Sequence, residues 1–370
     1  MGKNITICFD GTCNHPTDAR QEREWFGLGE IEDSSITNIV KLHLFLGGNL
    51  LNTAWNAGQH SFYYSGIGTY GNHLQRLFNV VFAPENLDVG RIVRKAREDL
   101  ASVWEKGDAV HLFGFSRGAA LARRFASILL HKGLPGIQET PSIRFLGVFD
   151  TVASLGLPNL DDEEKPVSDV VFENHTVAAN VQEAIHLVSL DENRIAFQPT
   201  LMNMDQRVTE IWFPGAHSDI GGGFFHDGLS DITLDFLMKE LGRRRLGLEF
   251  ISPEEVDYDK LRPSGEQCSI DHDDVIIIPD PEGRIHPKDR WYPVARATLA
   301  RRLIRVNKND RVSEELPVLH HSVVDRIQMV AGYRPENLKS APHCIYEKEC
   351  YFPRYQGLND HLSIKQLGNL

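Results

Sequence analysis

Residues 110–120 read Val-His-Leu-Phe-Gly-Phe-Ser-Arg-Gly-Ala-Ala, and the rest of the chain can be placed around them. Residues 109–113 form a short apolar run typical of a buried strand, and residues 117–131 repeat apolar side chains at helical spacing. Between them lies Gly-x-Ser-x-Gly, a strand-to-helix turn that presents a serine hydroxyl at a helix N-terminus. This context predicts that Ser116 is a nucleophile. The alternative is a glycine-rich turn with an incidental serine.

Composition limits the classes of protein that the chain can belong to. Of its 370 residues, 41% are hydrophobic and 24% are charged, which is typical of a globular protein. The net charge of −12 argues against a nucleic-acid partner, because phosphate groups need a basic surface. No apolar run reaches the roughly 18–20 residues of a membrane span, and the first residues lack a secretory apolar region. The five cysteines form no C-x-x-C pair, so we expect cytoplasmic synthesis without a disulfide framework.

Predicted strands and helices alternate along the first half of the chain. Strands are expected at 4–9, 62–64, 109–113, 143–149 and 210–213, and helices at 37–46, 87–104, 117–131, 177–188 and 232–241. Ser34 or Ser35 would cap the first helix, after a polar loop over 15–34. The alternation predicts an α/β three-layer sandwich with a mostly parallel central sheet, in a single domain over 1–370. Prolines and polar turns interrupt it over 242–290, which predicts an insertion or lid within that domain.

Two strands that follow Ser116 end on residues suited to support a serine nucleophile. One runs into Asp150 and the next leads to His217, which gives the order Ser, Asp, His that α/β-hydrolases use. A serine needs a base within hydrogen-bond reach, and the base needs a carboxylate that fixes its tautomer. We therefore predict the triad Ser116, Asp150 and His217. The alternative triad takes Asp219 as the acid and His320 or His321 as the base.

An oxyanion hole is expected beside the serine. The backbone N–H of Arg117, the residue after the nucleophile, would supply one donor. The turn Asp10-Gly11-Thr12 follows the first strand and would supply the second, from Gly11 or Thr12. A plain Asp-Gly turn without a catalytic role is the other interpretation of these residues.

Five motifs occur in an order that resembles a known family. They are the Asp-Gly-Thr turn at 10–12, Gly-Phe-Ser-Arg-Gly-Ala at 114–119, Gly-Val-Phe-Asp-Thr-Val at 147–152, the segment 212–223 with its His-Ser-Asp and three glycines, and the segment 319–338. Together they resemble the α/β-hydrolase domain of the group-1 type VI secretion phospholipase effectors. The chain differs in being short, with little room for the large membrane-anchoring insertions of those effectors.

The resemblance implies an α/β-hydrolase fold and ester hydrolysis of the phospholipase A type. It places Ser116, Asp150 and His217 at the catalytic positions, with an ester or phospholipid as substrate. We expect neither a cofactor nor a metal. For an effector, it also implies a peripheral membrane contact, export by a dedicated secretion system, and a secretion or immunity partner.

Two other classes of function remain open from the sequence. A metal-dependent phosphohydrolase would use Asp10, His217 and Asp219 as ligands at the edge of the sheet. A catalytically silent protein with a hydrolase fold would only bind a ligand or partner. The role of Ser116 distinguishes these classes, because neither of the alternatives requires a nucleophilic serine.

Overall fold

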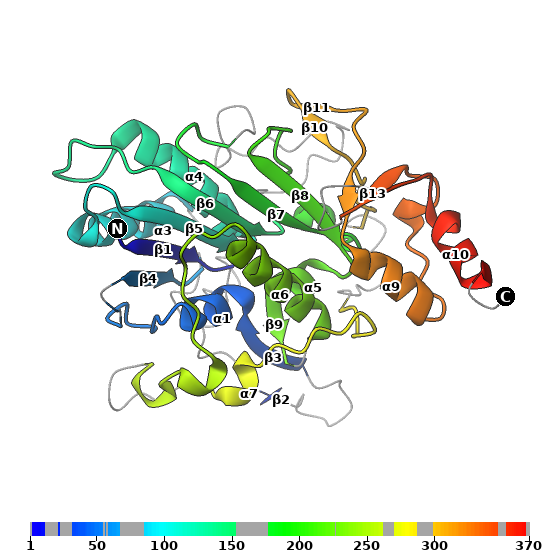
Figure 1. Ribbon diagram of the computed structural model, residues 1–370, viewed down its shortest axis with the longest axis horizontal. Helices are drawn as coiled ribbons and strands as arrows, with labels where there is room; N and C mark the ends of the chain where they lie inside the picture. The colour runs from blue at the N-terminus through cyan, green and yellow to red at the C-terminus, as the bar shows by residue number, and fades with distance from the viewer. Residues whose placement is uncertain are drawn as a thin grey trace.

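The structure is a computed structural model that describes residues 2–11, 21–22, 32–54, 56, 58–66, 85–152, 177–225, 227–261, 270–286, 299–346 and 353–367. A nine-stranded sheet runs through its centre in the order β14-β13-β12-β8-β7-β6-β5-β1-β4 (Figure 1). Neighbouring strands are parallel, except that β14 runs antiparallel to β13. The expected α/β class with a mostly parallel sheet is therefore confirmed.

The strands of this sheet are β1 (Asn4–Phe9), β4 (Gln59–Tyr64), β5 (Ala109–Phe115), β6 (Ile143–Phe149), β7 (Ala184–Ser189), β8 (Val208–Phe213), β12 (Val318–Leu319), β13 (His343–Ile345) and β14 (Arg354–Tyr355). Two smaller sheets consist of β2 (Gln21–Glu22), β3 (Glu32–Thr37) and β9 (Gly222–Phe224), and of β10 (Asn307–Lys308) and β11 (Arg311–Val312). The helices are α1 (Asn38–Phe45), α3 (Glu85–Val103), α4 (Arg117–Lys132), α5 (His217–Gly221), α6 (Gly228–Arg243), α7 (His272–Val275), α9 (His321–Met329) and α10 (Leu358–Leu367).

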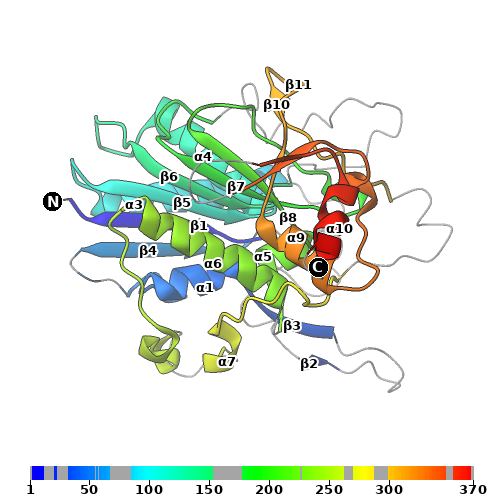
Figure 2. The same cartoon turned by 45° about the vertical axis from the view of Figure 1, so that its right-hand side comes forward.

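Helices cover both faces of the sheet, because its central strands are apolar on both sides. Along β5, Leu112 packs with the apolar residues of α3 and α4, whereas its neighbour Phe113 packs with those of α1 and α6. Both side chains are fully buried, as expected where alternate residues of a strand point to opposite faces. Figures 1 and 2 show the two helix pairs on opposite sides of the sheet, which gives three layers.

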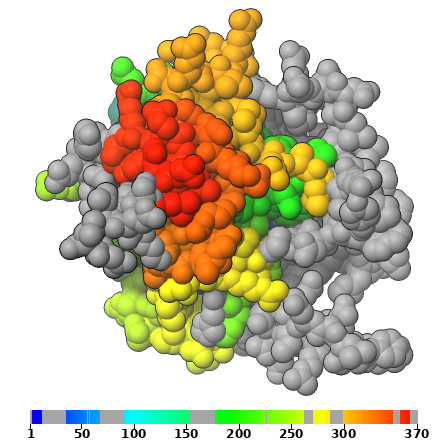
Figure 3. Space-filling model, turned by 90° about the vertical axis from the view of Figure 1, so that its right-hand side faces the viewer, coloured from blue at the N-terminus to red at the C-terminus, as the bar shows by residue number. Residues whose placement is uncertain are grey.

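A third apolar cluster closes the sheet at the β12–β13 end. Trp212 of β8 packs there with Leu319 of β12, Val323 and Ile327 of α9, and Leu358 of α10. Figure 3 shows the orange and red residues of this C-terminal part gathered on that end of the molecule. No helix in the described part of the chain is both long enough and apolar enough to cross a bilayer.

The structure corrects three local predictions. Residues 177–188 do not form a helix, since Ala184–Ser189 is the strand β7 between β6 and β8. Every residue of β7 is buried, so its apolar run lacks the two-residue alternation that would distinguish a strand from a helix. The cap of α1 is Thr37, whose hydroxyl accepts from the N–H of Val40, rather than Ser34 or Ser35. The predicted loop over 15–34 ends earlier, because β3 begins at Glu32.

The predicted insertion over 242–290 is described for residues 242–261 and 270–286. Leu246, Val256, Leu261, Ile270 and Val275 are buried in the same cluster as α1 and α6. This part of the segment therefore contributes to the apolar core below the sheet. Its action as a lid, and the extent of a single domain over 1–370, stay predictions.

The glycines of Gly-x-Ser-x-Gly are required by close backbone contacts. A Cβ atom on Gly114 would lie 2.5 Å from the carbonyl oxygen of Gly118. A Cβ atom on Gly118 would lie 2.3 Å from the carbonyl oxygens of both Phe9 and Asp10. The start of α4 is thus pressed against the end of β1, and this contact sets the position of the turn between β5 and α4.

We expect Gly118→Ala to destabilise the fold by about 1–3 kcal/mol, because the new methyl group would overlap two backbone oxygens that move only if β1 moves. Gly90→Ala is the matched control, since Gly90 is an exposed residue of α3 with nothing within 4 Å of the added Cβ. That change should be neutral or stabilise by up to about 1 kcal/mol. Urea unfolding of the two variants measures the difference, and equal stabilities would contradict the contact.

Candidate active site

Ser116 lies at the carboxyl edge of the parallel sheet, in the turn between β5 and α4. Its backbone has φ 58° and ψ −124°, a conformation that costs a non-glycine residue on the order of 1–3 kcal/mol. Such strain is concentrated at functional sites, and it is typical of the serine in a Gly-x-Ser-x-Gly turn. The side chain makes no capping bond to α4 and is available to a neighbouring residue.

His217 joins Ser116 to Asp150 through both of its ring nitrogens. Its Nε2 lies 2.8 Å from the Ser116 Oγ, and its Nδ1 lies 2.6 Å from the Asp150 Oδ2. All three residues are buried. The geometry fits a neutral imidazole that donates its Nδ1–H to the carboxylate and accepts the serine proton at Nε2.

Two aromatic rings pack against the imidazole, and a carboxylate holds the backbone of His217. The ring of Phe115 lies 4.7 Å from that of His217, and the ring of Phe197 meets it edge-on at 4.9 Å. The backbone N–H of His217 donates to Oε2 of Glu192 at 3.2 Å, and Glu192 is paired with Arg194. A side chain at Gly221 would collide with the Phe115 ring, so the small residue is needed behind the site.

Asp150 is fully buried and has four hydrogen-bond donors. Its Oδ1 accepts from the Ser189 N–H at 2.9 Å and from Arg302 Nη1 at 2.6 Å. Its Oδ2 accepts from His217 and from Arg302 Nη2, the latter at 2.8 Å. Burial alone would raise the pKa of Asp150, but the Arg302 charge and the hydrogen bonds of His217 and Arg302 hold that pKa well below its usual range. The carboxylate therefore stays ionised beside the imidazole.

Sequence reasoning missed Arg302. It lies 152 positions after Asp150, in a segment of the chain without regular structure, and it is only 1% exposed. Its guanidinium also donates to the carbonyl oxygens of Ser189 and Phe197. The sequence around it, Ala-Arg-Arg-Leu-Ile-Arg, contains other arginines, and nothing in the pattern marks the one that is buried.

The residues predicted for the oxyanion hole lie beside Ser116 where the structure describes them. Arg117 is the first residue of α4. The pairing of Phe9 with Gly114 brings Gly11 of the neighbouring strand end to the level of Ser116, and the Gly11 N–H donates to Asp10 Oδ1 at 2.6 Å. Thr12 lies outside the described residues.

Asp10 is buried next to this turn and bound by two hydroxyl groups. Thr37 Oγ1 lies 2.9 Å and Tyr63 Oη 2.7 Å from its carboxylate oxygens. Burial raises the pKa of Asp10 to about 7, although the hydrogen bonds from Tyr63, Gly11 and Thr37 act in the opposite direction. Its contacts are those of a residue that fixes the turn between β1 and the following loop.

The alternative acid and bases have other partners. Asp219 accepts from the Ala216 N–H at 2.7 Å and lies 2.6 Å from His286 Nδ1. His320 is buried, caps α9 and lies 2.8 Å from the Ser322 hydroxyl. His321 is exposed, 3.9 Å from Asp325. Within the described residues, no hydrogen bond joins Asp219, His320 or His321 to Ser116.

The ligands expected for a metal-dependent phosphohydrolase are divided among different sets of partners. Asp10 is bound by Thr37 and Tyr63, His217 lies between Ser116 and Asp150, and Asp219 contacts His286. Among the described residues, the group whose ligand atoms come together consists of Asp219, Asp227 and His286. Of the three expected ligands, only Asp219 belongs to it.

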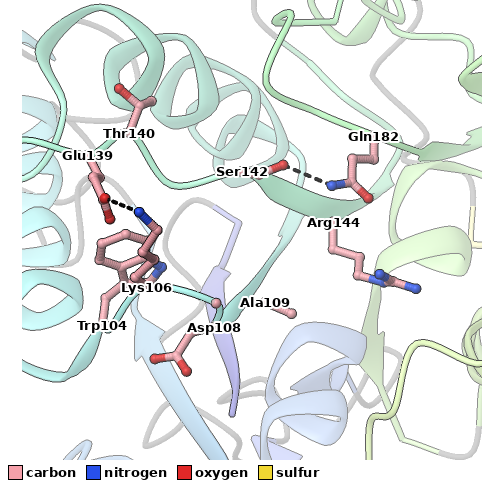
Figure 4. Close-up of a pocket in the computed structure, with 10 residues that line it drawn as sticks. Trp104, Lys106, Asp108, Ala109, Glu139, Thr140, Ser142, Arg144 and Gln182 are labelled. Carbon is pink, nitrogen blue, oxygen red and sulfur yellow. Dashed lines mark hydrogen bonds and ion pairs between the residues drawn. The ribbon is translucent and has the colours of Figure 1, made fainter. Parts of the chain in front are cut away.

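A surface hollow at the opposite edge of the sheet lies far from these residues along the strands. Its lining includes Ala109, the first residue of β5, whereas Ser116 follows the last one. Figure 4 shows Lys106 paired with Glu139 and Gln182 bonded to Ser142 in this hollow. The residues that line the hollow include none of the predicted site residues.

The chain is similar to several known proteins. The model of the family "T6SS, Phospholipase effector Tle1-like, catalytic domain" matches residues 3–140 and 135–240. An uncharacterized protein of Saccharomyces cerevisiae is 31% identical over 252 residues, which is 53% of this chain and 32% of that protein.

Two solved structures are also similar. An uncharacterized protein from Pseudomonas aeruginosa has a TM-score of 0.41 and 21% identity, over 68% of this chain and 47% of the other. A Tle1 effector bound to the VgrG spike of the type 6 secretion system has a TM-score of 0.40 and 23% identity, over 60% and 51%. The chain thus spans about a third of the yeast relative and about half of each solved chain.

The family match covers more than half of the chain, from the first strand to the end of α6, and includes Ser116, Asp150 and His217. It confirms the resemblance inferred from the five motifs. The chain belongs to the family of Tle1-like type VI secretion phospholipase effectors, within their catalytic domain.

Proposed function

We propose that this protein is a serine hydrolase that cleaves carboxylic esters, with Ser116 as nucleophile, His217 as general base and acid, and Asp150 as the residue that orients His217. The observation that carries the proposal is a pair of hydrogen bonds: the Ser116 hydroxyl lies 2.8 Å from His217 Nε2, which accepts its proton, and His217 Nδ1 donates to the Asp150 carboxylate at 2.6 Å. Nucleophile, base and carboxylate in this arrangement are what acyl transfer requires.

In the first half of the reaction, the Ser116 Oγ attacks the ester carbonyl carbon while its proton passes to His217 Nε2. The tetrahedral intermediate collapses when the same proton is given to the leaving alcohol, and an acyl-enzyme remains on Ser116. In the second half, His217 takes a proton from water, whose oxygen attacks the acyl carbon. The carboxylic acid then leaves as Ser116 regains its proton.

Asp150 and Arg302 act on the imidazole rather than on the substrate. The ionised carboxylate holds the Nδ1–H tautomer and stabilises the imidazolium that forms in each half-reaction. Arg302 keeps that carboxylate ionised and fixes both of its oxygens through a two-pronged contact. Arg302 is therefore a positioning residue.

The Arg117 N–H, at the start of α4, is the proposed first donor of the oxyanion hole. Gly11 is the proposed second donor, and its N–H would have to exchange Asp10 Oδ1 for the substrate oxygen. Loss of one such donor typically lowers turnover by about 10²–10³-fold.

Family membership supports a phospholipid as the substrate and a fatty acyl ester as the bond that is cleaved. It also supports export by a type VI secretion system, with a spike protein as partner, a neutralising immunity protein and a peripheral membrane contact. The two other classes considered from the sequence receive less support. The three ligands expected for a phosphohydrolase do not lie together at one site. A binding protein without catalytic activity would not require a strained serine that pairs with His217.

We expect Ser116→Ala and His217→Ala to abolish labelling by a fluorophosphonate and to lower the hydrolysis of short p-nitrophenyl esters by on the order of 10⁵–10⁶-fold. The two losses should be similar, because the members of a triad act as a unit. His321→Ala is the control, since that histidine is exposed on α9 and should leave labelling unchanged. Normal labelling of His217→Ala would assign the base to another residue.

We expect Asp150→Asn to lower turnover by on the order of 10⁴-fold, because the amide favours the wrong tautomer of His217. Arg302→Met should cost less activity but shift the acid limb of the pH–rate profile to higher pH. With Arg302 gone, burial raises the Asp150 pKa, so the carboxylate takes up a proton at a higher pH than in the wild type.

The neighbouring Arg301 provides a matched control, because it is exposed and its ion pair within the described residues is with Glu336 at the surface. Arg301→Met should leave the pH profile where it is. Arg302→Lys restores the charge without the two-pronged contact, so part of the shift should be reversed. An Arg302→Met enzyme that folds and keeps the wild-type profile would remove Arg302 from its assigned role.

Incubation with phospholipid vesicles should release free fatty acid and lysophospholipid, and Ser116→Ala should release neither. Mass spectrometry of the lipid extract identifies the bond that is cleaved. Release of a phosphorylated headgroup in place of fatty acid would contradict carboxylic ester cleavage.

A further inference from the structure

A second polar cluster includes a residue of α5, the helix that begins with His217. Asp219 belongs to α5, Asp227 precedes α6, and His286 comes from the segment 270–286. One ligand atom of each lies within 4.8 Å of the other two. Figures 1 and 2 show the yellow segment 270–286 passing beside α5 and the start of α6.

Hydrogen bonds within the protein account for both carboxylate oxygens of Asp219 but for only one of the two oxygens of Asp227. Both oxygens of Asp219 are occupied, Oδ2 by the N–H groups of Ala216 and His286 and Oδ1 by His286 Nδ1. Asp227 Oδ1 caps α6 by accepting from the N–H groups of Leu229 and Ser230. Its other oxygen, Oδ2, is buried and has no hydrogen-bond partner in the part of the chain that the structure describes. Asp227 itself is only 3% exposed.

The charges in the cluster are not balanced. Burial and the nearby charges of Asp219 and Asp231 together raise the pKa of Asp227 to about 7, although His286 and the hydrogen bond from the Ser230 N–H act in the opposite direction. Asp231 has its own cation, Lys41, at 2.9 Å. Two buried carboxylates therefore face one imidazole, and an unpaired buried oxygen is costly unless a positive group compensates it.

We propose that Asp219, Asp227 and His286 bind one divalent transition-metal ion, Zn²⁺ or Mn²⁺, with water completing its coordination. Two carboxylates neutralise a double positive charge, and an imidazole nitrogen favours these ions over Mg²⁺ and Ca²⁺, which prefer oxygen ligands alone. The His286 side chain is 25% exposed, which gives an ion a route from solvent. Asp227 Oδ2 takes no part in the cap of α6 and is therefore available as a ligand atom for the ion.

The ion would connect three segments behind the catalytic residues. Asp219 lies two positions after His217, Asp227 is the N-cap of α6, and the ring of His286 stacks on Phe224 of β9 at 4.0 Å. Binding would fasten α5 to its neighbours without contacting Ser116 or the substrate. The inference does not depend on the proposed ester hydrolysis, and its test does not use activity.

The experiment measures metal binding by the full chain. Wild-type protein is stripped with a chelator, dialysed, and titrated with Zn²⁺ or Mn²⁺, and its metal content and melting temperature are measured. We expect about one ion per chain and a rise in melting temperature of about 3–5 °C when the ion is present at 100 times its Kd. Mg²⁺ and Ca²⁺ at the same concentration should produce a smaller rise.

Two variants and two controls locate the site. Asp227→Asn keeps the cap of α6 and removes the charge, so the metal-free variant should melt at or above the wild-type temperature and lose the rise with metal. His286→Gln should also lose the rise. Asp273→Asn and His272→Gln change an exposed Asp–His pair of α7 and should keep it.

Three results would overturn the proposal. One is a wild-type protein that binds neither ion and melts at the same temperature with and without metal. Another is a rise that survives in both Asp227→Asn and His286→Gln, which would place the ion elsewhere. The third is an equal rise with Mg²⁺ or Ca²⁺, which would contradict the assignment to a transition metal.

Discussion

The buried carboxylate of Asp150 is the constraint on which the arrangement of the active site depends. A buried charge needs hydrogen-bond donors for both oxygens. Here the donors are Ser189 at the end of β7, His217 at the start of α5, and Arg302. These donors come from three segments that are far apart along the chain. Satisfying one carboxylate therefore fixes the C-terminal part of the chain against the sheet and the imidazole against Ser116.

The parallel sheet explains why such a site can form at all. The strands β5, β6 and β8 all end at the same edge, so the residues that follow them meet there whatever their separation in sequence. The turn at Ser116 is held by close packing as well as by hydrogen bonds, since the Ser116 N–H donates to the Phe149 carbonyl and the Val152 N–H donates to the Ser116 carbonyl. Gly118 touches the backbone of β1, and Gly221 leaves room for the ring of Phe115 behind His217. Small residues at these two points allow the strained serine and its base to approach each other.

The histidine is supported from two sides that differ in chemistry. On one side, aromatic rings and the Glu192–Arg194 pair hold His217. On the other, α5 continues into Asp219 and the polar cluster with His286. A short helix between these two groups carries the base. The position of His217 thus depends both on the packing of the aromatic rings against its imidazole and on the charged residues at the two sides of α5.

The sequence alone indicated most of the fold and three of the residues that lie in contact at the site, Ser116, Asp150 and His217. The strand–glycine–serine–helix pattern indicated the turn at Ser116, and the strand ends indicated Asp150 and His217, because local apolar runs and glycines act over a few residues. It failed at β7, since a strand buried on both faces has no alternation to recognise.

Only the tertiary structure decided which distant polar residues become partners. The sequence contains several arginines near Arg302 and several histidines in its C-terminal half. Nothing in the sequence indicates which of them pairs with a buried carboxylate. Packing buries Arg302 beside Asp150, places His320 in the cap of α9, and brings His286 to Asp219. Residues far apart in the sequence become charge partners because the packing of the sheet and its helices brings them together. The periodicity of apolar residues along the chain does not indicate which residues these are.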